Sequence, residues 1–380
     1  PSSVNYSLYK QPFVIEENGK VYARVRDISG QVVETIHDVT NIDKVNPNVV
    51  AYTGIMMYKD LNFASGLNGL EVYNNSNNGN VTITRKAMET PTGSGYGIEV
   101  KTLGTASPGL GGVYFGTESL PNKVYVTRIL AKIPKGYKIN LGTNQIGNGY
   151  SYRWLTSQQG TGEFEEYICE VKCGSTGTFS STDFFYLDGG SAPVTWGIAS
   201  ATVFDANHGN AILLYGTDNL SGVKYYGETT SSTAEPTYKE VDPADCTTAQ
   251  IITGLTQTGT HYVWVKDSAT NKNKTSVVTN DLTDGYILTI NPNGGRWNNT
   301  TSNSTRTQDY NTTIDLGKAT PPAGYKVTFN GNGGSTPAAI NTTKSFTNWT
   351  LSGNGILDGT VYTFRVWWGT VTPKYKNDPI

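Results

Sequence analysis

The sequence has few charged residues. Asp, Glu, Lys and Arg make up only 16% of its 380 residues, compared with roughly 25% in a typical soluble domain. The 29 basic and 31 acidic residues nearly balance and leave a net charge of −2. Because a nucleic-acid-binding protein needs a basic patch or stripe, we expect no nucleic-acid partner.

Long apolar runs and helical patterns are also missing. No segment approaches the ~18 consecutive apolar residues of a membrane-spanning helix, so we expect no membrane insertion within this chain. Ala, Leu, Glu and Lys do not recur at the 3.6-residue spacing of an amphipathic helix. The chain holds instead 43 Gly and 24 Tyr among many Ser, Thr, Asn and Val residues. Tyr, Thr and Val favour strands, and Gly and Asn favour turns, so an all-β fold is predicted.

Cysteine is scarce. The three cysteines, Cys169, Cys173 and Cys246, are too few and odd in number for a disulfide framework. Cys169 and Cys173 are four residues apart in a predicted strand, which is roughly 13 Å, whereas a disulfide needs Cα atoms within about 7 Å. We therefore expect buried thiols. A zinc site is not indicated, because none of the three His residues has ligand spacing.

A strand-and-turn unit occurs twice near the C-terminus. Residues 288–295 read LTINPNGG and residues 327–334 read VTFNGNGG, a spacing of 39 residues. Repetition of this kind indicates modular construction, and 380 residues suffice for two to four domains. Because Pro1 is not a translation start, we expect a fragment or a processed form of a longer protein.

The pattern of turns and alternating segments divides the chain into four units. Residues 1–45 hold a hairpin pattern but are short for a complete sandwich. Residues 46–210 hold about ten alternating segments, which suits a jelly roll. Residues 211–283 form a third unit, and residues 284–380 hold the two repeats. The predicted fold is a multidomain string of β-sandwiches, immunoglobulin-like and jelly roll, followed by β-grasp-like repeats.

The last two units resemble known families of bacterial modules. Residues 284–380 are similar to internalin-type B repeats, which are β-grasp-like modules of bacterial surface proteins. The matching residues are 288–295, 322–325, 327–334 and 346–349. Residues 211–283 resemble bacterial immunoglobulin-like repeats. The matching residues are 222–227, 236–238 and 259–267.

The first two units carry further resemblances. Residues 1–45 look like the end of another immunoglobulin-like repeat, through residues 17–27 and 39–43. Residues 46–210 are similar, in strand pattern and size alone, to carbohydrate-binding jelly rolls of secreted glycosidases and phage tail proteins. The resemblances imply an extracellular stalk on a bacterial cell surface or a phage appendage.

An aromatic alternation gives the best candidate binding site. Tyr150, Tyr152 and Trp154 share one side of a predicted strand, and Arg153 lies on the other. Aromatic rings stack on the apolar faces of sugars, so three in line would form a glycan platform. The alternative is that the aromatic side belongs to the core and the Arg153 side is exposed. Arg128 interrupts an apolar strand and is predicted to face solvent or to pair with a carboxylate.

A calcium site is the candidate metal site. Asp60, Asn62 and Asp205 lie near the two predicted ends of the 46–210 unit, and calcium often links such ends through oxygen ligands. The chain lacks a compact Asp-x-Asp-x-Asp loop, so a structural calcium and no cofactor at all both remain open.

Catalytic patterns are weak. A glycosidase needs two carboxylates facing each other across a cleft, whereas Glu163, Glu165, Glu166 and Glu170 lie along one predicted strand. No Gly-x-Ser-x-Gly elbow occurs. We therefore expect a protein that is not an enzyme.

The expected function is that of an extracellular surface or adhesion protein on a bacterial cell or phage virion. The 46–210 unit would contact cell-surface or matrix glycans. One alternative is a structural subunit of a bacterial surface fibre or phage tail fibre, in which exposed strand edges bind neighbouring modules or further copies. Another is an accessory binding region of a larger secreted glycosidase.

Overall fold

The computed structural model confirms the all-β prediction. Every regular element among the described residues is a β-strand. No helix in this part of the chain is long and apolar enough to cross a membrane. The structure describes residues 7–60, 62–67, 69–73, 81–91, 93, 95–104, 109–115, 119–142, 149–176, 184–241, 249–283, 285–309, 312–324, 326–327, 340–341, 343–352, 356–364 and 368–377.

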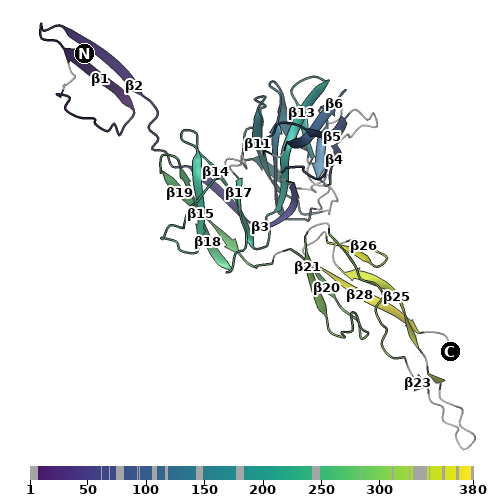
Figure 1. Cartoon of the computed structure of the whole chain (residues 1–380). Helices are drawn as coiled ribbons and strands as arrows, with labels where there is room; N and C mark the ends of the chain where they lie inside the picture. Colours follow the sequence, from purple (N-terminus) through teal and green to yellow (C-terminus); the bar gives the residue numbers. More distant parts are fainter. Residues whose placement is uncertain are drawn as a thin grey trace, which may run out of the picture.

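The largest part of the molecule is a two-layered β-sandwich, here called the large sandwich (Figure 1). One sheet has the order β5–β6–β13–β8–β11–β10, and the opposite sheet has the order β4–β7–β12–β9. The second half of β3 pairs with β13 on the same edge as β6, further along the strand. The strands are β3 (Asn48–Asp60), β4 (Leu70–Tyr73), β5 (Val81–Ala87), β6 (Tyr96–Thr102), β7 (Gly112–Phe115), β8 (Val124–Lys132), β9 (Lys138–Gly142), β10 (Ser151–Trp154), β11 (Phe164–Lys172), β12 (Phe184–Asp188) and β13 (Val194–Asp205).

The core of the large sandwich follows from the period of two along its strands. Ile129 and Ala131 of β8 point inward and are fully buried. Phe185 and Leu187 of β12 in the opposite sheet also point inward and are fully buried. Burying an Ile, Leu or Phe side chain contributes about 1.5–3 kcal/mol. The same core contains the buried thiols of Cys169 and Cys173, whereas Cys246 lies outside the described residues.

A second, smaller sandwich packs beside the first and is here called the small sandwich. The first half of β3 joins β14 and β17 in one layer, and the other layer has the order β16–β15–β18–β19. Ile212, Leu214, Val263 and Val265 meet in its core. The strands are β14 (Ala211–Thr217), β15 (Val223–Thr229), β16 (Lys239–Glu240), β17 (Ala249–Ile252), β18 (Gly259–Asp267) and β19 (Lys272–Thr279).

Strand β3 belongs to both sandwiches. Its residues 48–54 pair with β14, and its residues from Ile55 onward pair with β13. The change occurs at Gly54, where an added Cβ would lie 1.9 Å from the carbonyl oxygen of Asp205. Only glycine fits so close to another backbone. The large sandwich is therefore inserted after the first strand of the small one, between Gly54 and Ala211, which are themselves a paired couple.

The two sandwiches share an apolar interface. It brings outward-facing residues of β14 and β17 onto the outer face of β8 and β11. Its buried members are Val126, Ile168, Phe204, Ala211, Leu213, Tyr215 and Ala249. Because this face of β8 and β11 is covered, the large sandwich buries apolar side chains on both sides of its longer sheet.

The C-terminal module follows the small sandwich. Its main sheet has the order β21–β20–β28–β25, with β20 and β28 parallel. The buried indoles of Trp297 and Trp349 donate to the carbonyls of Leu316 and Gly317, at 2.7 and 2.8 Å. The strands are β20 (Tyr286–Ile290), β21 (Ser304–Gln308), β22 (Thr313–Asp315), β23 (Lys326–Val327), β24 (Ile340–Asn341), β25 (Lys344–Ser352), β26 (Ile356–Asp358), β27 (Val361–Thr363) and β28 (Trp368–Asn377).

The N-terminal hairpin consists of β1 (Gly19–Arg26) and β2 (Val32–Val39). Figure 1 shows it projecting from the small sandwich, with the linker after β2 leading into β3. The first C-terminal repeat, residues 288–295, contains the end of β20 and a following turn, while most of the second, residues 327–334, lies outside the described residues. The limits of the four predicted units stay predictions.

Candidate functional site

The predicted aromatic platform divides between the surface and the core. Tyr150 and Tyr152 are 40% and 47% exposed. Trp154 is partly buried and packs on the core, with its ring centroid 6.0 Å from that of Phe185. The three rings therefore do not form one continuous exposed row, and glycan binding by Tyr150 and Tyr152 stays a prediction.

Arg153 lies at the contact between the two sandwiches. Its guanidinium is 2.9 Å from the carboxylate of Glu170 and donates to the hydroxyl of Tyr52 at 3.2 Å. The Tyr52 hydroxyl also donates to Glu170. Burial is the main cause that raises the pKa of Tyr52, followed by the bond to Glu170. Since Tyr52 is on the half of β3 that belongs to the small sandwich, this triad links the two units.

Arg128 pairs with a carboxylate, one of the two outcomes predicted for it. Its Nε donates to Glu166 on β11, and its Nη1 donates to the hydroxyl of Ser200 on β13 at 3.1 Å. Both charged side chains are almost completely buried. An ion pair withdrawn from water in this way anchors the sheet and offers no open contact to a ligand.

The structure does not bring the three predicted calcium ligands together. Asp60 pairs with Ala201 in the β3–β13 ladder, whereas Asp205 pairs with Ile55. The backbones of Asp60 and Asp205 are therefore separated by four strand residues, roughly 13 Å. Asn62 is exposed, and its side-chain oxygen accepts the backbone N–H of Ala64 at 3.0 Å.

Asp205 has a structural environment of its own at the start of the C-terminal module. Its carboxylate accepts a hydrogen bond from the side chain of Asn207, and the hydroxyl of Tyr286 donates to it at 3.4 Å. The ring of His208 lies edge-on to that of Tyr286, 6.4 Å between centroids. Burial raises the pKa of Asp205 to about 6 and lowers the pKa of His208 to about 4.

A different group of carboxylates comes together where the linker enters the small sandwich. Carboxylate oxygens of Asp43, Asp218 and Asp267 lie within 4.8 Å of one another. The hydroxyl of Ser221 donates to Asp43 at 2.6 Å and is the main cause that lowers the pKa of this carboxyl group. The Asn271 amide donates to Asp267 at 2.8 Å. Carboxylates and hydroxyls are ligands of the kind that calcium takes, so these residues could hold a cation.

The outer face of the β4–β7–β12–β9 sheet combines aromatic and polar side chains. Each of its strands alternates between core residues and outward residues, so the outward set lies on one surface. We call this surface the polar-aromatic face; its members are Glu71, Tyr73, Tyr114, Lys138, Asn140, Tyr186 and Asp188.

A row of cross-strand neighbours forms the centre of this face. Tyr73 pairs with Gly112, Gly112 with Tyr186, and Tyr186 with Asn140. The ring centroids of Tyr73 and Tyr186 are 6.4 Å apart; Tyr73 is 9% exposed and Tyr186 is half-buried. Gly112 lies between them, and an added Cβ there would meet the carbonyl oxygen of Phe185 at 1.9 Å. The residue between the two rings is therefore restricted to glycine.

Hydrogen bonds fix the polar groups around this row. The amide of Asn140 donates to Asp188 at 3.1 Å, and the Tyr114 hydroxyl donates to Glu71, which is the main cause that raises the pKa of Tyr114 to about 12. Burial raises the pKa of Tyr186, and Asp188 and Tyr152 add to this effect. Trp154 contacts Phe185, the residue before Tyr186 in β12, so the predicted platform adjoins the strand that carries Tyr186.

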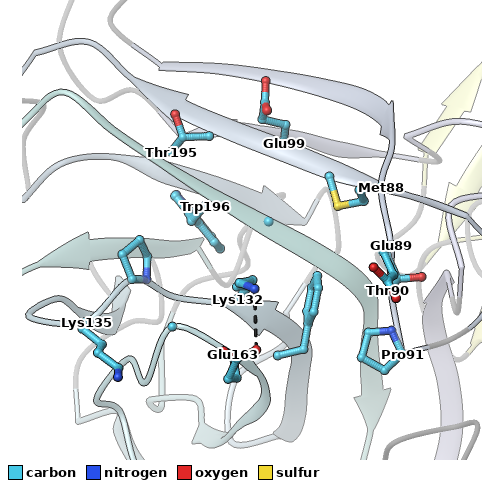
Figure 2. Close-up of a pocket in the computed structure, with 14 residues that line it drawn as sticks. Met88, Glu89, Thr90, Pro91, Glu99, Lys132, Lys135, Glu163, Thr195 and Trp196 are labelled. Carbon is cyan, nitrogen blue, oxygen red and sulfur yellow. Dashed lines mark ion pairs between the residues drawn. The ribbon is translucent and has the colours of Figure 1, made fainter.

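A groove of about 850 Å³ crosses the longer sheet of the large sandwich (Figure 2). Thr195 and Gly197 of β13 and Phe164 of β11 line it, and one side carries the Lys132–Glu163 ion pair at 3.6 Å. The lining residues are mostly charged or small, and the Trp196 side chain that borders them is 3% exposed. The groove therefore offers less aromatic surface for stacking than the polar-aromatic face does.

The sequence held a partial signal for these residues. In β12 the alternation places Phe185 and Leu187 on one side and Tyr186 and Asp188 on the other, but it does not say which side is exposed. Nothing in the sequence relates Asp43 to residues such as Asp218 that lie far along the chain.

Comparison with known proteins places the chain in no family. No protein-family model matches it, and no curated protein matches it either. A function for this chain therefore has to be inferred from the arrangement of its residues.

Proposed function

We propose that this protein is a non-catalytic surface or adhesion protein of a bacterial cell or phage virion, and that its large sandwich contacts glycans through the polar-aromatic face. The observation that carries the proposal is the row formed by Tyr73, Gly112, Tyr186 and Asn140. Tyrosine faces stack on the C–H surface of sugar rings. Amide, carboxylate and ammonium groups at the same surface suit the hydroxyls of a sugar.

The spacing of the acidic residues supports binding without hydrolysis. Glu71 on β4 and Asp188 on β12 are two strands apart, and Glu71 lies level with Phe184, four residues before Asp188. With about 4.8 Å between strands and 3.3 Å per residue, the backbones that carry the two carboxylates are roughly 16 Å apart. Glycosidases place their pair about 5–9.5 Å apart.

A glycan array followed by calorimetry tests this proposal. Tyr186→Ala removes the central ring, and we expect affinity for the bound glycan to fall about tenfold or more, which corresponds to ~1.4 kcal/mol. Tyr152→Ala should give a smaller loss, since Tyr152 borders the same face.

Thr195→Trp is the matched control. It inserts a bulky side chain into the groove of Figure 2 at an exposed position and should leave glycan binding unchanged. Loss of binding in Thr195→Trp with normal binding in Tyr186→Ala would mean that glycans bind in the groove and not on the polar-aromatic face. Absence of glycan binding by the wild type would refute the proposal.

A structural subunit of a surface fibre or phage appendage is the second candidate. It is favoured by the exposed aliphatic side chains of the N-terminal hairpin, where Val25 and Val33 are each 71% exposed. Exposed apolar surface on a strand pair favours association with other polypeptide. Light scattering and electron microscopy should then show ordered assemblies, and a monomer at all concentrations would speak against this function.

A further inference from the structure

The N-terminal hairpin repeats the β18–β19 hairpin residue by residue. Its cross-strand pairs run from Gly19↔Val39 to Arg26↔Val32. The pairs of β18 and β19 run from Gly259↔Thr279 to Lys266↔Lys272. Every residue of one ladder therefore corresponds to the residue 240 positions further on in the other, from 19 to 259 and from 39 to 279.

The turns that close the two hairpins also correspond. Asp27 donates its backbone N–H to the carbonyl of Gln31 at 3.0 Å, and its carboxylate accepts the N–H of Gln31 at 2.8 Å. Asp267 makes the same two bonds with Asn271, again at 3.0 and 2.8 Å. Strand register and turn geometry thus agree, so the two hairpins are the same structural element.

The two faces of the N-terminal hairpin differ in charge. Residues alternate between the faces, with even numbers on one and odd numbers on the other. The even face carries all the charged side chains of β1 and β2, which are Lys20, Arg24, Arg26, Glu34 and Asp38, together with Tyr22, Val32 and Ile36. The odd face carries Val21, Ala23, Val25, Val33, Thr35 and His37. An antiparallel sheet with this division has a solvent side and a core side.

The core side of the N-terminal hairpin is exposed around Val25 and Val33, whereas its counterpart is covered. Val25 is 71% exposed, but the corresponding Val265 is completely buried. In the small sandwich this face packs on aliphatic side chains of the layer formed by β3, β14 and β17, among them Ile212 and Leu214. The same molecule therefore shows what covers a hairpin of this kind.

We propose that the odd face of the N-terminal hairpin is an interaction surface for a three-stranded antiparallel sheet with aliphatic side chains at alternate positions, the counterpart of the β3–β14–β17 layer. The hairpin supplies two strands of the second layer, and the partner supplies the first. The even face stays in solvent, where Lys20 and Asp38 form an ion pair at 3.0 Å.

Hydrogen exchange and two substitutions test the state of this face in the chain as it is. Val25→Asp should leave the melting temperature unchanged, because an exposed side chain loses no buried contact. Val265→Asp places a charge at the equivalent buried position and should lower the melting temperature by several degrees. The amides of β1 and β2 should exchange at least tenfold faster than those of β18 and β19. Equal protection of the two hairpins, or equal effects of the two substitutions, overturns the proposal.

An extended chain tests the partner. Copies of residues 46–54 and 211–258, joined by a short Gly-Ser linker, are fused directly before Gly19, because Gly19 corresponds to Gly259. We expect exchange of the β1 and β2 amides to slow by at least tenfold. The control extension carries Ile212→Asp and Leu214→Asp in the copy and should give no slowing.

Two outcomes decide against the proposal in this second experiment. Exchange that is equally fast with the extension and with its control means that the aliphatic layer does not cover the hairpin. Sedimentation that shows a dimer of the original chain, dissociated by Val25→Asp, assigns the face to a second copy of the hairpin instead.

Discussion

Two buried groups, Asp205 and His208, should make stability depend on pH in a way that single substitutions reveal. Burial raises the pKa of Asp205 from 3.8 to about 6 and lowers the pKa of His208 from 6.5 to about 4. One pKa unit corresponds to about 1.4 kcal/mol. Each group therefore changes the free energy of unfolding by about 3 kcal/mol across its own pH window.

The two contributions have opposite signs. The folded state binds the Asp205 proton more tightly than the unfolded state, so the contribution of Asp205 is present near pH 4 and is lost as the pH rises through about 6. The unfolded state binds the His208 proton more tightly, so the contribution of His208 is present above pH 6.5 and is lost as the pH falls through about 4. Between these limits the two effects nearly cancel in the wild type.

Asp205→Asn should separate the pH-dependent contributions of Asp205 and His208 to stability. The amide keeps an oxygen for the Asn207 side chain and can donate to the Tyr286 hydroxyl, but it cannot ionise. We expect the variant to be more stable than the wild type by up to about 3 kcal/mol near pH 7, with the difference shrinking toward zero near pH 4. Urea titrations followed by tryptophan fluorescence at several pH values between about 4 and 7 measure this difference.

His208→Gln is the reciprocal variant and keeps Asp205. Its stability relative to the wild type should rise as the pH falls, because only the Asp205 contribution remains. A difference between Asp205→Asn and the wild type that is the same at every pH would refute the reasoning, since it would mean that Asp205 does not change its ionisation in this window.

Two further substitutions test the packing. Gly54→Ala should lower the melting temperature strongly or prevent folding, because its Cβ would lie 1.9 Å from the Asp205 carbonyl oxygen. In the control Gly197→Ala the new Cβ would lie 3.6 Å from its nearest atom, so the melting temperature should change little. Similar effects of the two substitutions would contradict the conclusion that β3 requires glycine where it passes between the sandwiches. Arg128→Met leaves the buried Glu166 without its main partner and should cost about 3–5 kcal/mol, measured by denaturant titration. Recovery of most of that loss on adding Glu166→Gln is expected, and a mild effect of Arg128→Met alone would count against a buried pair.

Local patterns in the sequence were enough to predict strands but not their neighbours. Tyr, Thr and Val in alternation, with Gly and Asn between, indicated the all-β fold that the structure confirms. The alternation at Tyr150, Tyr152 and Trp154 placed the rings on one side of a strand. It could not show that Trp154 would meet Phe185 of another sheet, since burial depends on what lies opposite.

The arrangement of strands from distant segments could not be predicted from the sequence for the same reason. The residues around Gly54 form an ordinary apolar strand pattern, and nothing in them indicates that β3 passes from one sandwich to the other. The polar-aromatic face needed four strands from distant segments to be placed side by side. Asp43, Asp218 and Asp267 come together only because the linker, one loop and one turn meet at the same end of the small sandwich.

The insertion of the large sandwich between Gly54 and Ala211 has a mechanical consequence. Asn48 begins the small sandwich and Thr279 ends it, and its first and last strands, β3 and β19, are in contact. Tension between the hairpin and the C-terminal module would enter at one of these residues and leave at the other. Gly54 and Ala211 pair in the β3–β14 ladder and so hold the two ends of the inserted sandwich together. The surface that we propose to hold glycans would lie outside the path of this force and keep its shape while the chain is under tension.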